Sequence, residues 1–598
     1  MENKIESDNQ IKITYRPGEN PEKDAWHTAF FIENHMDYFA YPDHVASPEQ
    51  VTFMVYTEED ERYYPCSDRM FEAIMSKNDS HFLQKKYKEV LQRIMELLDS
   101  RIEDERDKGF LEALIKIKFL HETQDEMMIP SRIEKRLLKI FLDRTLIDDP
   151  FLCEKAIRNN RVSKALCSEA FKKAINQVDN TVILNSPSTL AGIKEFVEHI
   201  EIKRLLSLSV ESALWESDKL EAHKEGDFHA LFNRQMIGDG VKPLLTFLGI
   251  ERKEDQTKKI LWLADESGEI IVDIAIIKHL AKLGHKIIVV FKEGPLYTKV
   301  DLLDAHGDEI LSKQLEGAFF IKEKNLGKNE FVRILRSDNN IIAISDGTRE
   351  NFNPLLASKV FSRSFREVDG IISRGHDQKR RIFENHFQFT KDIFNISRGP
   401  DGSTLISYKP RHPSVIKFSH GALEKKAKII IDKMEEAKKR GMTVIFYSGI
   451  IGSIPGKIQM AKKIMSVFID FLKNQFAMTF IINPSEYFEI GMDADDLMYM
   501  WEIVQRSGYI DIWRFQSYDD IVNAFQAMDK KVPPEWVGKD ATYSTGCTKE
   551  MKIALDVQKK HPEMQIIGPS VEKFMRRNEY GIGKMYDQRL SELCELSP

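Results

Sequence analysis

The spacing of hydrophobic residues changes along the chain at about residue 257. Between residues 66 and 250, apolar positions recur every three or four residues, as in FLQKKYKEVLQRIMELLDSRIEDERDKGFLEALIKIKFL (82–120). This period predicts amphipathic helices. Beyond residue 257, short apolar runs alternate with helical patterns, which is typical of a largely parallel sheet with crossover helices. The runs are KILWLA, HKIIVVF, GAFFIK, NIIAIS, VDGIIS and FQFTKDIFNI.

The pattern predicts an α/β protein in four regions. They are an irregular N-terminal region (1–65), a helical subdomain (66–250), an α/β core (251–414) and a smaller C-terminal α/β domain (415–598). Prolines and scattered aromatic residues interrupt any long period in the first region. The core ends in a stretch rich in Gly, Pro and Ser, RGPDGSTLISYKPRHPS. The last region is expected to hold a helix at 421–440 and strands at 442–448 and 477–483.

Composition narrows the class of protein further. The 598 residues are 42% hydrophobic and 30% charged, with a net charge of −7 and no long basic run, which argues against a nucleic-acid surface. Apolar runs such as IIVVF (287–291) are too short to span a bilayer. The polar start lacks an apolar export region, so a cytoplasmic location is expected. Five cysteines without CxxC spacing indicate neither a disulfide framework nor a zinc site.

The most informative segment is LWLADESGEIIVD, in which a buried strand runs through an acidic turn into a helix. This is where open α/β sheets bind ligands. Asp265 and Glu266 offer oxygen ligands to a divalent cation, and the helix N–H groups beside Ser267 suit a phosphate. Only Gly268 is present where a dinucleotide loop needs several glycines. The alternative is that these carboxylates merely stabilise the start of the helix.

The next strand is followed by GPLYTKVDLLDA (294–305), which carries both acids and a base. Asp301 and Asp304 are three residues apart and could share one face of a short helix. Either could reach a metal, or both could only cap that helix. Lys299 would oppose a metal beside it, and would instead bind a phosphate or neutralise a carboxylate.

Later strands also end in hydrogen-bonding groups. NIIAIS ends at Ser345 and Asp346, and VDGIIS leads to Arg374 and His376, which could clamp an anion or simply be surface polarity. Lys391 lies in an otherwise apolar run. An unpaired buried charge is costly, so this lysine is expected to contact a phosphate or to form a structural ion pair.

Two loops of the last region contain glycines. SGIIGSIPGKIQMA (448–461) has isoleucines where a nucleotide-binding P-loop needs Gly and Ser or Thr, so a standard triphosphate site is rejected. This loop and YSTGCTKEM (543–551) could still hold an anion. Cys547 in the second loop is weak evidence for a reactive thiol.

Several of these segments together resemble the DUF-eighty-nine (DUF89) family, the metal-dependent damage-control phosphatases of the ARMT-like type. LWLADESGEIIVD is similar to the family's Asp-Asn-x-Gly-Glu-x-x-x-Asp turn, and GPLYTKVDLLDA to its Asn-Asp-x-Thr-x-x-Asp-Ala segment. VDGIISRG resembles its Lys-Gly strand exit and FTKDIF its later lysine-bearing strand. IPSRIEKRLLKIFLDRTLIDDPFLCEKAIRNN (129–160) looks like its helical N-terminal pattern. The resemblance covers roughly residues 65–410.

The resemblance implies a helical subdomain and an α/β core that holds one divalent metal, Mg²⁺ or Mn²⁺, with Co²⁺ or Ni²⁺ as alternatives. By position, Asp265 is the first metal ligand and a catalytic residue, and Lys391 is the catalytic, phosphate-binding lysine. Glu266 replaces an Asn ligand and could coordinate through oxygen. Lys299 replaces the family's second Asp, so either Asp301 takes over as a ligand after a small shift of the loop, or the metal site is weakened or lost.

The expected activity is hydrolysis of a phosphomonoester on a small phosphorylated metabolite, with neither nucleic acid nor membrane as partner. The expected phosphate-binding residues are Ser267, Lys299, Ser345, Asp346, Arg374 and Lys391, with Arg374 in place of a family lysine. One alternative is a non-catalytic or repurposed member that pairs Lys299 with Asp265 and binds an anionic metabolite or a partner. Another is a transferase that uses the C-terminal domain.

Overall fold

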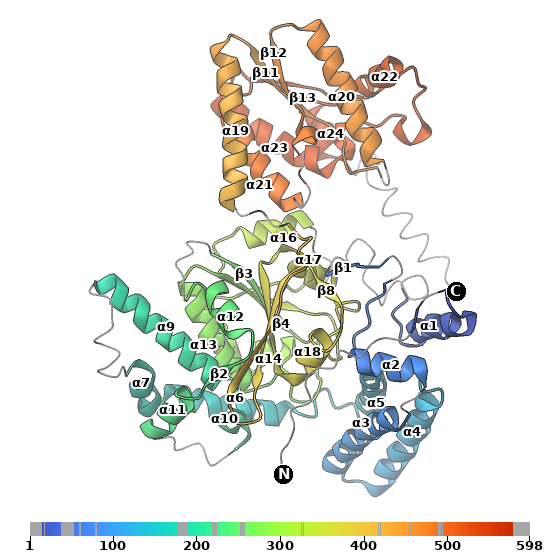
Figure 1. Cartoon of the computed structure of the whole chain (residues 1–598), viewed down its shortest axis with the longest axis vertical. Helices are drawn as coiled ribbons and strands as arrows, with labels where there is room; N and C mark the ends of the chain where they lie inside the picture. Colours follow the sequence, from blue (N-terminus) through green and yellow to red (C-terminus); the bar gives the residue numbers. More distant parts are fainter. Residues whose placement is uncertain are drawn as a thin grey trace. The chain divides into compact units, whose positions relative to one another are not determined.

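A computed structural model describes residues 15–37, 53–177, 189–217, 224–250 and 257–577, apart from positions 17, 59–60, 78–79, 324–325, 327, 417, 419, 455–456, 488, 490–491 and 493. The chain divides into two compact units, Met1–Pro413 and Ser414–Pro598 (Figure 1). None of the described helices is long and apolar enough to cross a membrane. Four of the five cysteines are described and are free thiols, whereas Cys594 lies outside the described residues.

The elements of the first unit alternate as the sequence pattern indicates. Its helices are α1 (Pro21–Glu33), α2 (Asp68–Ser76), α3 (Ser80–Arg101), α4 (Glu105–Thr123), α5 (Pro130–Thr145), α6 (Leu152–Cys167), α7 (Glu169–Asn176), α9 (Leu190–Leu208), α10 (Ala213–Glu216), α11 (Glu225–Phe232), α12 (Val241–Phe247), α13 (Glu269–Lys282), α14 (Leu302–Gly307), α15 (Glu309–Gln314), α16 (Lys328–Leu335), α17 (Lys359–Glu367) and α18 (Gly375–Ile382). Its strands are β1 (Met54–Val55), β2 (Met236–Ile237), β3 (Lys259–Leu263), β4 (Lys286–Phe291), β5 (Phe319–Phe320), β6 (Ile341–Ser345), β7 (Gly370–Arg374), β8 (Gln388–Phe389), β9 (Asp392–Arg398) and β10 (Thr404–Lys409).

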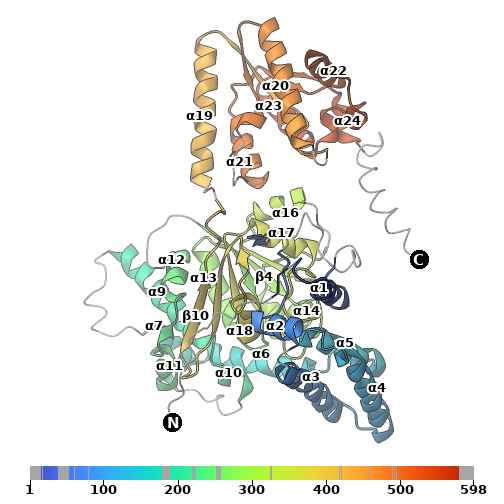
Figure 2. The same cartoon turned by 45° about the vertical axis from the view of Figure 1, so that its right-hand side comes forward.

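An eight-stranded sheet forms the centre of this unit, in the order β2-β10-β9-β7-β3-β4-β6-β5 (Figures 1 and 2). Neighbouring strands are parallel except β9 and β10, which are antiparallel. Leu263 pairs with Val290 of β4 and with Ser373 of β7, so β3, β4 and β7 end at the same edge. The prediction of a largely parallel α/β core is therefore confirmed.

Both faces of the sheet are covered by helices. Leu261 and Leu263 pack into one hydrophobic core with helices that include α1–α5 and α17. Ile260 and Trp262 point the other way, into a core with helices that include α6, α9 and α13. Because side chains on both faces are buried, these strands appear in the sequence as unbroken apolar runs rather than alternating ones.

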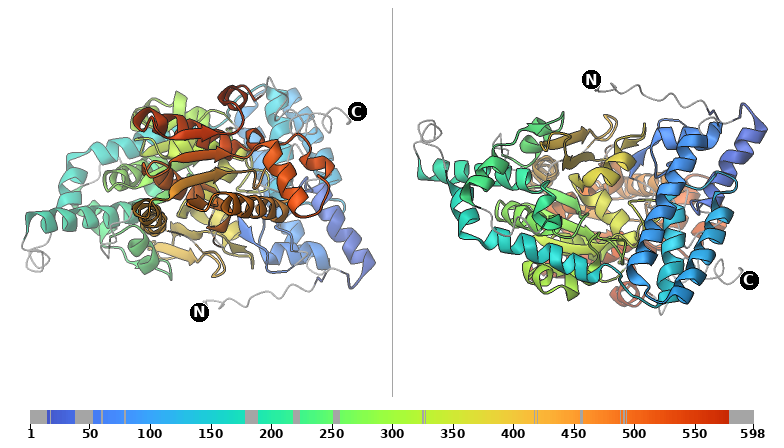
Figure 3. Two further views of the ribbon diagram at one scale, coloured as in Figure 1. Left: turned by 90° about the horizontal axis from the view of Figure 1, so that it is seen from above. Right: turned by 90° about the horizontal axis from the view of Figure 1, so that it is seen from below.

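The helical part begins earlier in the chain than predicted. Helices α3, α4 and α5 pack against one another (Figure 3). Within the stretch expected to be irregular, residues 21–33 form α1. The Asn20 side chain accepts hydrogen bonds from the backbone N–H groups of Glu22 and Lys23, and Pro21 occupies the first turn. These are helix-start signals that outweigh the irregular aromatic spacing.

The segment from 388 to 409 also differs from the prediction. The run FQFTKDIFNI is divided between β8, which pairs with β1, and β9, which begins at Asp392. The stretch rich in Gly, Pro and Ser contains β10, which returns antiparallel to β9. Strand β10 is only partly buried, so its polar residues hide it from a search for apolar runs.

The second unit is a smaller α/β layer structure. Its elements are α19 (His420–Lys439), β11 (Thr443–Ser448), α20 (Ile458–Gln475), β12 (Thr479–Ile482), η2 (Pro484–Glu486), α21 (Ala494–Gln505), β13 (Ile512–Phe515), α22 (Tyr518–Ala527), η3 (Pro534–Trp536), η4 (Ala541–Tyr543), α23 (Thr545–Lys560), β14 (Gln565–Ile567) and α24 (Val571–Met575). The sheet is parallel, in the order β12-β11-β13-β14. Phe446 faces a core with α19, α21 and α23, and Tyr447 faces one with α20 and α22.

Candidate functional site

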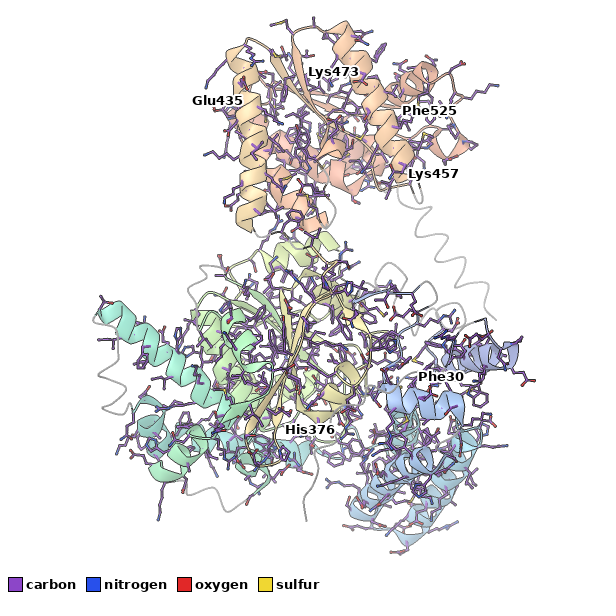
Figure 4. The ribbon with its side chains drawn as sticks, in the orientation of Figure 1. Phe30, His376, Glu435, Lys457, Lys473 and Phe525 are labelled. Atoms are coloured by element: carbon purple, nitrogen blue, oxygen red, sulfur yellow. The ribbon has the colours of Figure 1, made fainter. Side chains whose placement is uncertain are left out.

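The carboxyl ends of β3, β4 and β7 bring three polar segments together. Asp265 and Glu266 follow β3, Lys299 lies in the loop after β4, and Asp377 lies in the first turn of α18, after β7. Figure 4 labels the exposed neighbour of Asp377, His376. Two helices begin at this edge, α13 and α18, and the N-terminus of a helix favours an anion.

Both strand-to-helix turns depend on a glycine. Gly268 (φ +86°) precedes α13 and Gly375 (φ +73°) begins α18, and both values favour glycine. A Cβ atom at Gly375 would lie 2.3 Å from Asp265 Oδ2, and one at Gly268 would lie 2.4 Å from Cβ of Trp215. Gly375 therefore allows α18 to begin close to the Asp265 carboxylate, and Gly268 allows the turn after β3 to pack against Trp215.

The loop after β4 is fixed to the turn after β3 by backbone hydrogen bonds. The N–H of Val300 donates to the carbonyl of Asp265, and the N–H of Ser267 donates to the carbonyl of Thr298, each at 2.9 Å. Tyr297 has a φ of +52°, within the tight turn that the N–H of Lys299 closes on Leu296. These bonds place the Lys299 side chain directly beside Asp265.

Lys299 is the centre of a group of three carboxylates. Its Nζ lies 2.5 Å from Asp265 Oδ1, 3.4 Å from Glu266 Oε1 and 3.7 Å from Asp377 Oδ2. The Lys299 residue is 6% exposed, whereas the side chains of Glu266 and Asp377 are 30% and 43% exposed. The pair of Lys299 and Asp265 is therefore buried, and the partly exposed side chains of Glu266 and Asp377 lie between it and solvent.

Two arginines complete the charge balance of the site. Arg158 of α6 lies 3.7 Å from Glu266 Oε2, and Arg380 of α18 lies 3.6 Å from Asp377 Oδ1. With Lys299 on Asp265, each of the three carboxylates has a cation beside it. Arg158 is shared with Glu154, to which it donates at 2.7 Å, so each carboxylate of the site has a cation nearby but Glu266 does not have one to itself.

Burial shifts the titration of the central pair. Burial raises the pKa of Asp265 to about 6, although the Lys299 ammonium acts in the opposite direction. For Lys299, burial alone would lower the pKa, but Asp265, Glu266 and Asp377 together raise it well above its ordinary value. Lys299 is therefore charged at neutral pH, and Asp265 is a more basic carboxylate than usual.

A second buried ammonium lies nearby, also among three carboxylates. Lys155 Nζ lies 2.8 Å from Asp149 Oδ2, 3.1 Å from Asp301 Oδ2 and 2.8 Å from Asp304 Oδ2. These three acids are also close enough to one another to hold a metal ion. Burial raises the pKa of Asp304 to about 6, against the effect of Lys155. Asp301, expected to complete the metal site, therefore lies in a separate group from Asp265.

Arg374 is directed into the protein interior. It is fully buried, and its guanidinium lies 2.9 Å from Glu269 Oε1 and 3.2 Å from Asp273 Oδ2. It also donates to the carbonyl of Ser209 at 2.6 Å. Burial raises the pKa of Glu269 well above its ordinary value. The structure does not place Arg374 as the phosphate clamp expected from the sequence, because its guanidinium faces two buried acids and donates to the carbonyls of Ser209 and Ile396.

Ser345 and Asp346 are likewise bonded to protein groups, in their own loop and at the exit of the neighbouring strand β4. Ser345 Oγ donates to Glu293 at 2.5 Å, and Asp346 accepts from Lys292 at 2.6 Å and from the N–H of Thr348 at 2.8 Å. Lys292 and Asp346 thus form a second buried Lys–Asp pair at the neighbouring strand exit. The structure gives these two residues a role in shaping the loop, not the expected phosphate contacts.

Lys391 lies at the opposite edge of the sheet. It precedes β9, whose first residue, Asp392, pairs with Gly370, which in turn pairs with Ile260 at the start of β3. By this register Lys391 is level with Lys259, six residues before Asp265 in the chain. At the rise of a strand, six residues correspond to about 20 Å. Lys391 donates to the carbonyl of Arg366 at 2.5 Å. The expectation that it binds the same phosphate as Asp265 is therefore wrong. Lys391 comes before its strand and Asp265 comes after its strand, so the two residues lie at opposite ends of the sheet.

Buried polar atoms without a hydrogen-bond partner adjoin the site. Ser267 Oγ and Asn159 Nδ2 have none among the described residues, although both side chains are fully buried. The other end of the Asn159 side chain accepts from the N–H of Gly268 at 2.7 Å. Because such atoms are costly to bury unsatisfied, they are suited to meet a bound group.

Sequence reasoning did not assign Arg158 or Asp377 to the site, and it noted Asn159 only as part of the helical segment 129–160 that resembles the family. Arg158 and Asn159 lie on α6, more than a hundred residues before Asp265, and no local pattern links the two segments. Asp377 could have been selected, because it follows a strand exit directly in the same Arg-Gly-His-Asp segment.

The thiol singled out in the second unit is not activated. Cys547 is buried, and its Sγ donates to the carbonyl of Gly449 at 3.3 Å. Burial raises its pKa well above the ordinary value, so the thiolate is disfavoured. The other glycine loop includes positions 455 and 456, which lie outside the described residues.

The fold and the site define an α/β protein with a buried acid–base group at the carboxyl edge of a parallel sheet. The sequence profile of the damage-control phosphatase ARMT1-like domain matches residues 61–398, which is more than half of the chain. The chain therefore belongs to the ARMT1-like damage-control phosphatase family, and the family expectation from the sequence is confirmed.

Other comparisons add little to this assignment. No curated protein matches the sequence. Among solved structures, the crystal structure of a DUF89 family protein from Pyrococcus horikoshii is 15% identical, covering 54% of this chain and 98% of that chain, with a TM-score of 0.37. That likeness is too low to support an argument about the site. Family membership by itself supports a phosphatase-like role in general.

The family is metal-dependent in general, so the fit of a divalent metal can be tested on these residues. Asp265 and Glu266 both present oxygens, but the Lys299 ammonium occupies the space between them. A divalent ion about 3.5 Å from an ammonium is repelled by roughly 9 kcal/mol at an effective dielectric constant of about 20. In this arrangement the residues do not fit a divalent metal unless Lys299 leaves.

Proposed function

We propose that this chain hydrolyses the phosphomonoester of a small phosphorylated metabolite at the carboxyl edge of its large sheet. The observation that supports this most directly is the Lys299–Asp265 pair, buried beside the two helix N-termini of α13 and α18. A fixed ammonium and two helix N-termini favour a phosphoryl group, and a basic carboxylate beside them favours proton transfer. Membership of a phosphatase family supports the same class of reaction.

The two central residues take different roles in this proposal. Lys299 donates hydrogen bonds to the phosphoryl oxygens and stabilises the charge on them as the transition state forms. Asp265 accepts a proton from the water that attacks phosphorus while the bond to the metabolite's oxygen breaks. The leaving oxygen takes a proton from the adjacent solvent to give the alcohol, and Asp265 then returns its proton to solvent. The raised pKa of Asp265 favours this role at neutral pH, because proton transfer to a carboxylate is more favourable when its pKa is closer to the working pH.

Neighbouring groups would position the ligand. Ser267 Oγ and Asn159 Nδ2, which lack partners among the described residues, are suited to hydrogen bonds with the bound group. Glu266 and Asp377, on the solvent side, would select against ligands with a second negative charge close to the phosphate. A small sugar phosphate with hydroxyl groups next to the ester meets these conditions, since hydroxyls can donate to both carboxylates.

The second candidate is a repurposed family member that binds a phosphorylated metabolite without hydrolysing it. The observation that favours it is that Lys299, Arg158 and Arg380 each lie within 3.7 Å of a carboxylate of the site. In that case phosphate binds by displacing Asp265 from Lys299, and no base remains in place.

A phosphatase assay separates these functions. Full-length protein would be treated with a chelator and assayed against sugar phosphates and a generic aryl phosphate, without metal and with Mg²⁺, Mn²⁺, Co²⁺ or Ni²⁺ restored. We expect phosphate release that is lost in Asp265→Asn. Ligand binding without phosphate release would support the second candidate. A folded protein that shows neither ligand binding nor phosphate release would contradict the proposed function.

A further inference from the structure

The Lys299 ammonium occupies the position that a bound cation would take at this site. Its Nζ is within 3.7 Å of oxygens from Asp265, Glu266 and Asp377. An ammonium and a divalent ion compete for the same carboxylate oxygens, because both are cations that oxygen ligands stabilise. The carboxylate group is thus already neutralised by a side chain of the protein.

The geometry of the loop keeps Lys299 in this position. Its backbone forms a bridge with Glu266, and the neighbouring Val300 donates to the carbonyl of Asp265 at 2.9 Å. Val300 is itself fully buried in the core beneath. Moving the ammonium away would leave Asp265, which is 6% exposed, as a buried carboxylate without its nearest cation.

Asp301, which was expected to replace the family aspartate that is missing here, has no free oxygen to offer a metal. Asp301 Oδ1 accepts from the N–H groups of Leu303 and Asp304, where it caps α14, and Oδ2 faces Lys155 at 3.1 Å. Turning Asp301 toward Asp265 would break the cap and leave Lys155 with fewer partners. The loop shift that a metal would need is therefore opposed by several bonds at once.

The second group of carboxylates follows the same arrangement. Within the described part of the chain, Asp149, Asp301 and Asp304 form the one group of three His, Cys, Asp or Glu side chains close enough to hold an ion. Lys155 Nζ is within 3.1 Å of all three and is almost fully buried. Both places where acids converge near this strand edge are thus occupied by a lysine ammonium.

From these contacts we infer that Lys299 is a built-in replacement for the divalent cation, so that this chain excludes metal from the site on which its family relies. The inference rests on the proposed function only in taking the same site as the ligand site. Metal binding itself is independent of whether hydrolysis occurs. Phosphate or a phosphomonoester would therefore be held without a divalent metal, by the ammonium and the hydrogen-bond donors around it.

Mn²⁺ binding to the full-length protein tests this inference. After chelation and desalting, free Mn²⁺ would be titrated by electron paramagnetic resonance against the wild type, Lys299→Asp and Lys299→Asn. We expect no stoichiometric binding to the wild type and one Mn²⁺ per chain in Lys299→Asp, about 100-fold tighter than any wild-type binding. Adding Asp265→Asn to Lys299→Asp should abolish it. Lys292→Met is the matched control, because it removes the ammonium of a buried Lys–Asp pair that belongs to no group of three acids, and it should leave the Asp265 site closed to metal.

Two results would overturn the inference. One is Mn²⁺ bound to the wild type at one per chain and lost in Asp265→Asn. The other is a folded Lys299→Asp, checked by circular dichroism, that binds no Mn²⁺; Lys299→Asn, which removes the charge with less disturbance, would then have to fail as well. Binding of inorganic phosphate in the presence of chelator, measured by calorimetry on the same samples, reports separately on the proposed function.

Discussion

The Lys299 ammonium lies 2.5 Å from the Asp265 carboxylate, although 34 positions separate the two residues in the chain. The contact joins the turn after β3 to the loop after β4, two strands that are neighbours in the sheet. Each residue stabilises the charged form of the other, because the Lys299 ammonium lowers the pKa of Asp265 and the Asp265 carboxylate raises the pKa of Lys299. Each prediction about this site therefore concerns the pair rather than either residue alone.

Removing the ammonium should abolish most of the activity. In Lys299→Met we expect kcat/KM for a phosphomonoester to fall by about 10²–10³-fold, because the phosphoryl charge loses its fixed cation. Lys292→Met is the matched control, since it removes the ammonium of the other buried Lys–Asp pair, 2.6 Å from Asp346, without touching this site. Steady-state kinetics of both variants test this prediction. An equal loss of kcat/KM in Lys299→Met and Lys292→Met would show that only folding was affected.

The pH dependence of activity should report the titration of Asp265. Asp265 accepts a proton only when ionised, and burial raises its pKa to about 6, so kcat/KM should fall about tenfold per pH unit below that value and level off above it. Lys299 acts to lower this pKa. The residual activity of Lys299→Met should therefore begin to fall at a higher pH than that of the wild type. The substrate's own ionisation is the same for both enzymes, so an unchanged midpoint would contradict the role of Asp265.

The sequence predicted most of the α/β core because its signals are local. Buried parallel strands give unbroken apolar runs, and LWLADESGEIIVD contains a strand, a turn and a helix start in thirteen residues. The pairing of Lys299 with a carboxylate was also foreseeable, since a lysine beside acids has few other stable partners. Strand β10 escaped because a partly buried strand near the sheet edge keeps polar residues.

Other parts of the site depend on three-dimensional arrangement that a single sequence does not record. Lys391 and Asp265 both lie next to apolar strands, but one precedes its strand and the other follows it, which separates them by the length of the sheet. Arg374 stands at a strand exit like a ligand-binding residue, yet its side chain turns inward to Glu269 and Asp273. Side-chain direction at a strand end is set by the packing around it, which sequence spacing leaves open.

Gly375 should be intolerant of a side chain for a reason specific to this site. In Gly375→Ala the new Cβ would approach Asp265 Oδ2 to 2.3 Å at a φ of +73°, so the carboxylate must move away from Lys299. We expect a loss of activity of about tenfold or more, beyond the roughly 1 kcal/mol of stability that a positive φ costs an alanine. Gly317→Ala is the control, because Gly317 has a φ of +85° and no described atom within 4 Å of the added Cβ. Similar kinetics for the two variants would contradict the proposed contact.

Arg374 should prove to be a determinant of stability rather than a ligand for phosphate. Its guanidinium is fully buried against Glu269 and Asp273, and Trp262 Nε1 donates to the same Asp273 at 2.9 Å. Arg374→Met would leave two buried carboxylates without their cation, which costs about 3–5 kcal/mol in the free energy of unfolding. Arg374→Lys keeps the charge but loses the planar set of donors, so a smaller loss is expected. Urea unfolding followed by tryptophan fluorescence measures the first effect.

The KM of Arg374→Lys for a phosphomonoester should stay within about threefold of the wild type, since its side chain points away from the ligand edge. A large rise in KM with unchanged stability would restore Arg374 to the phosphate-binding role that its position in the sequence indicates.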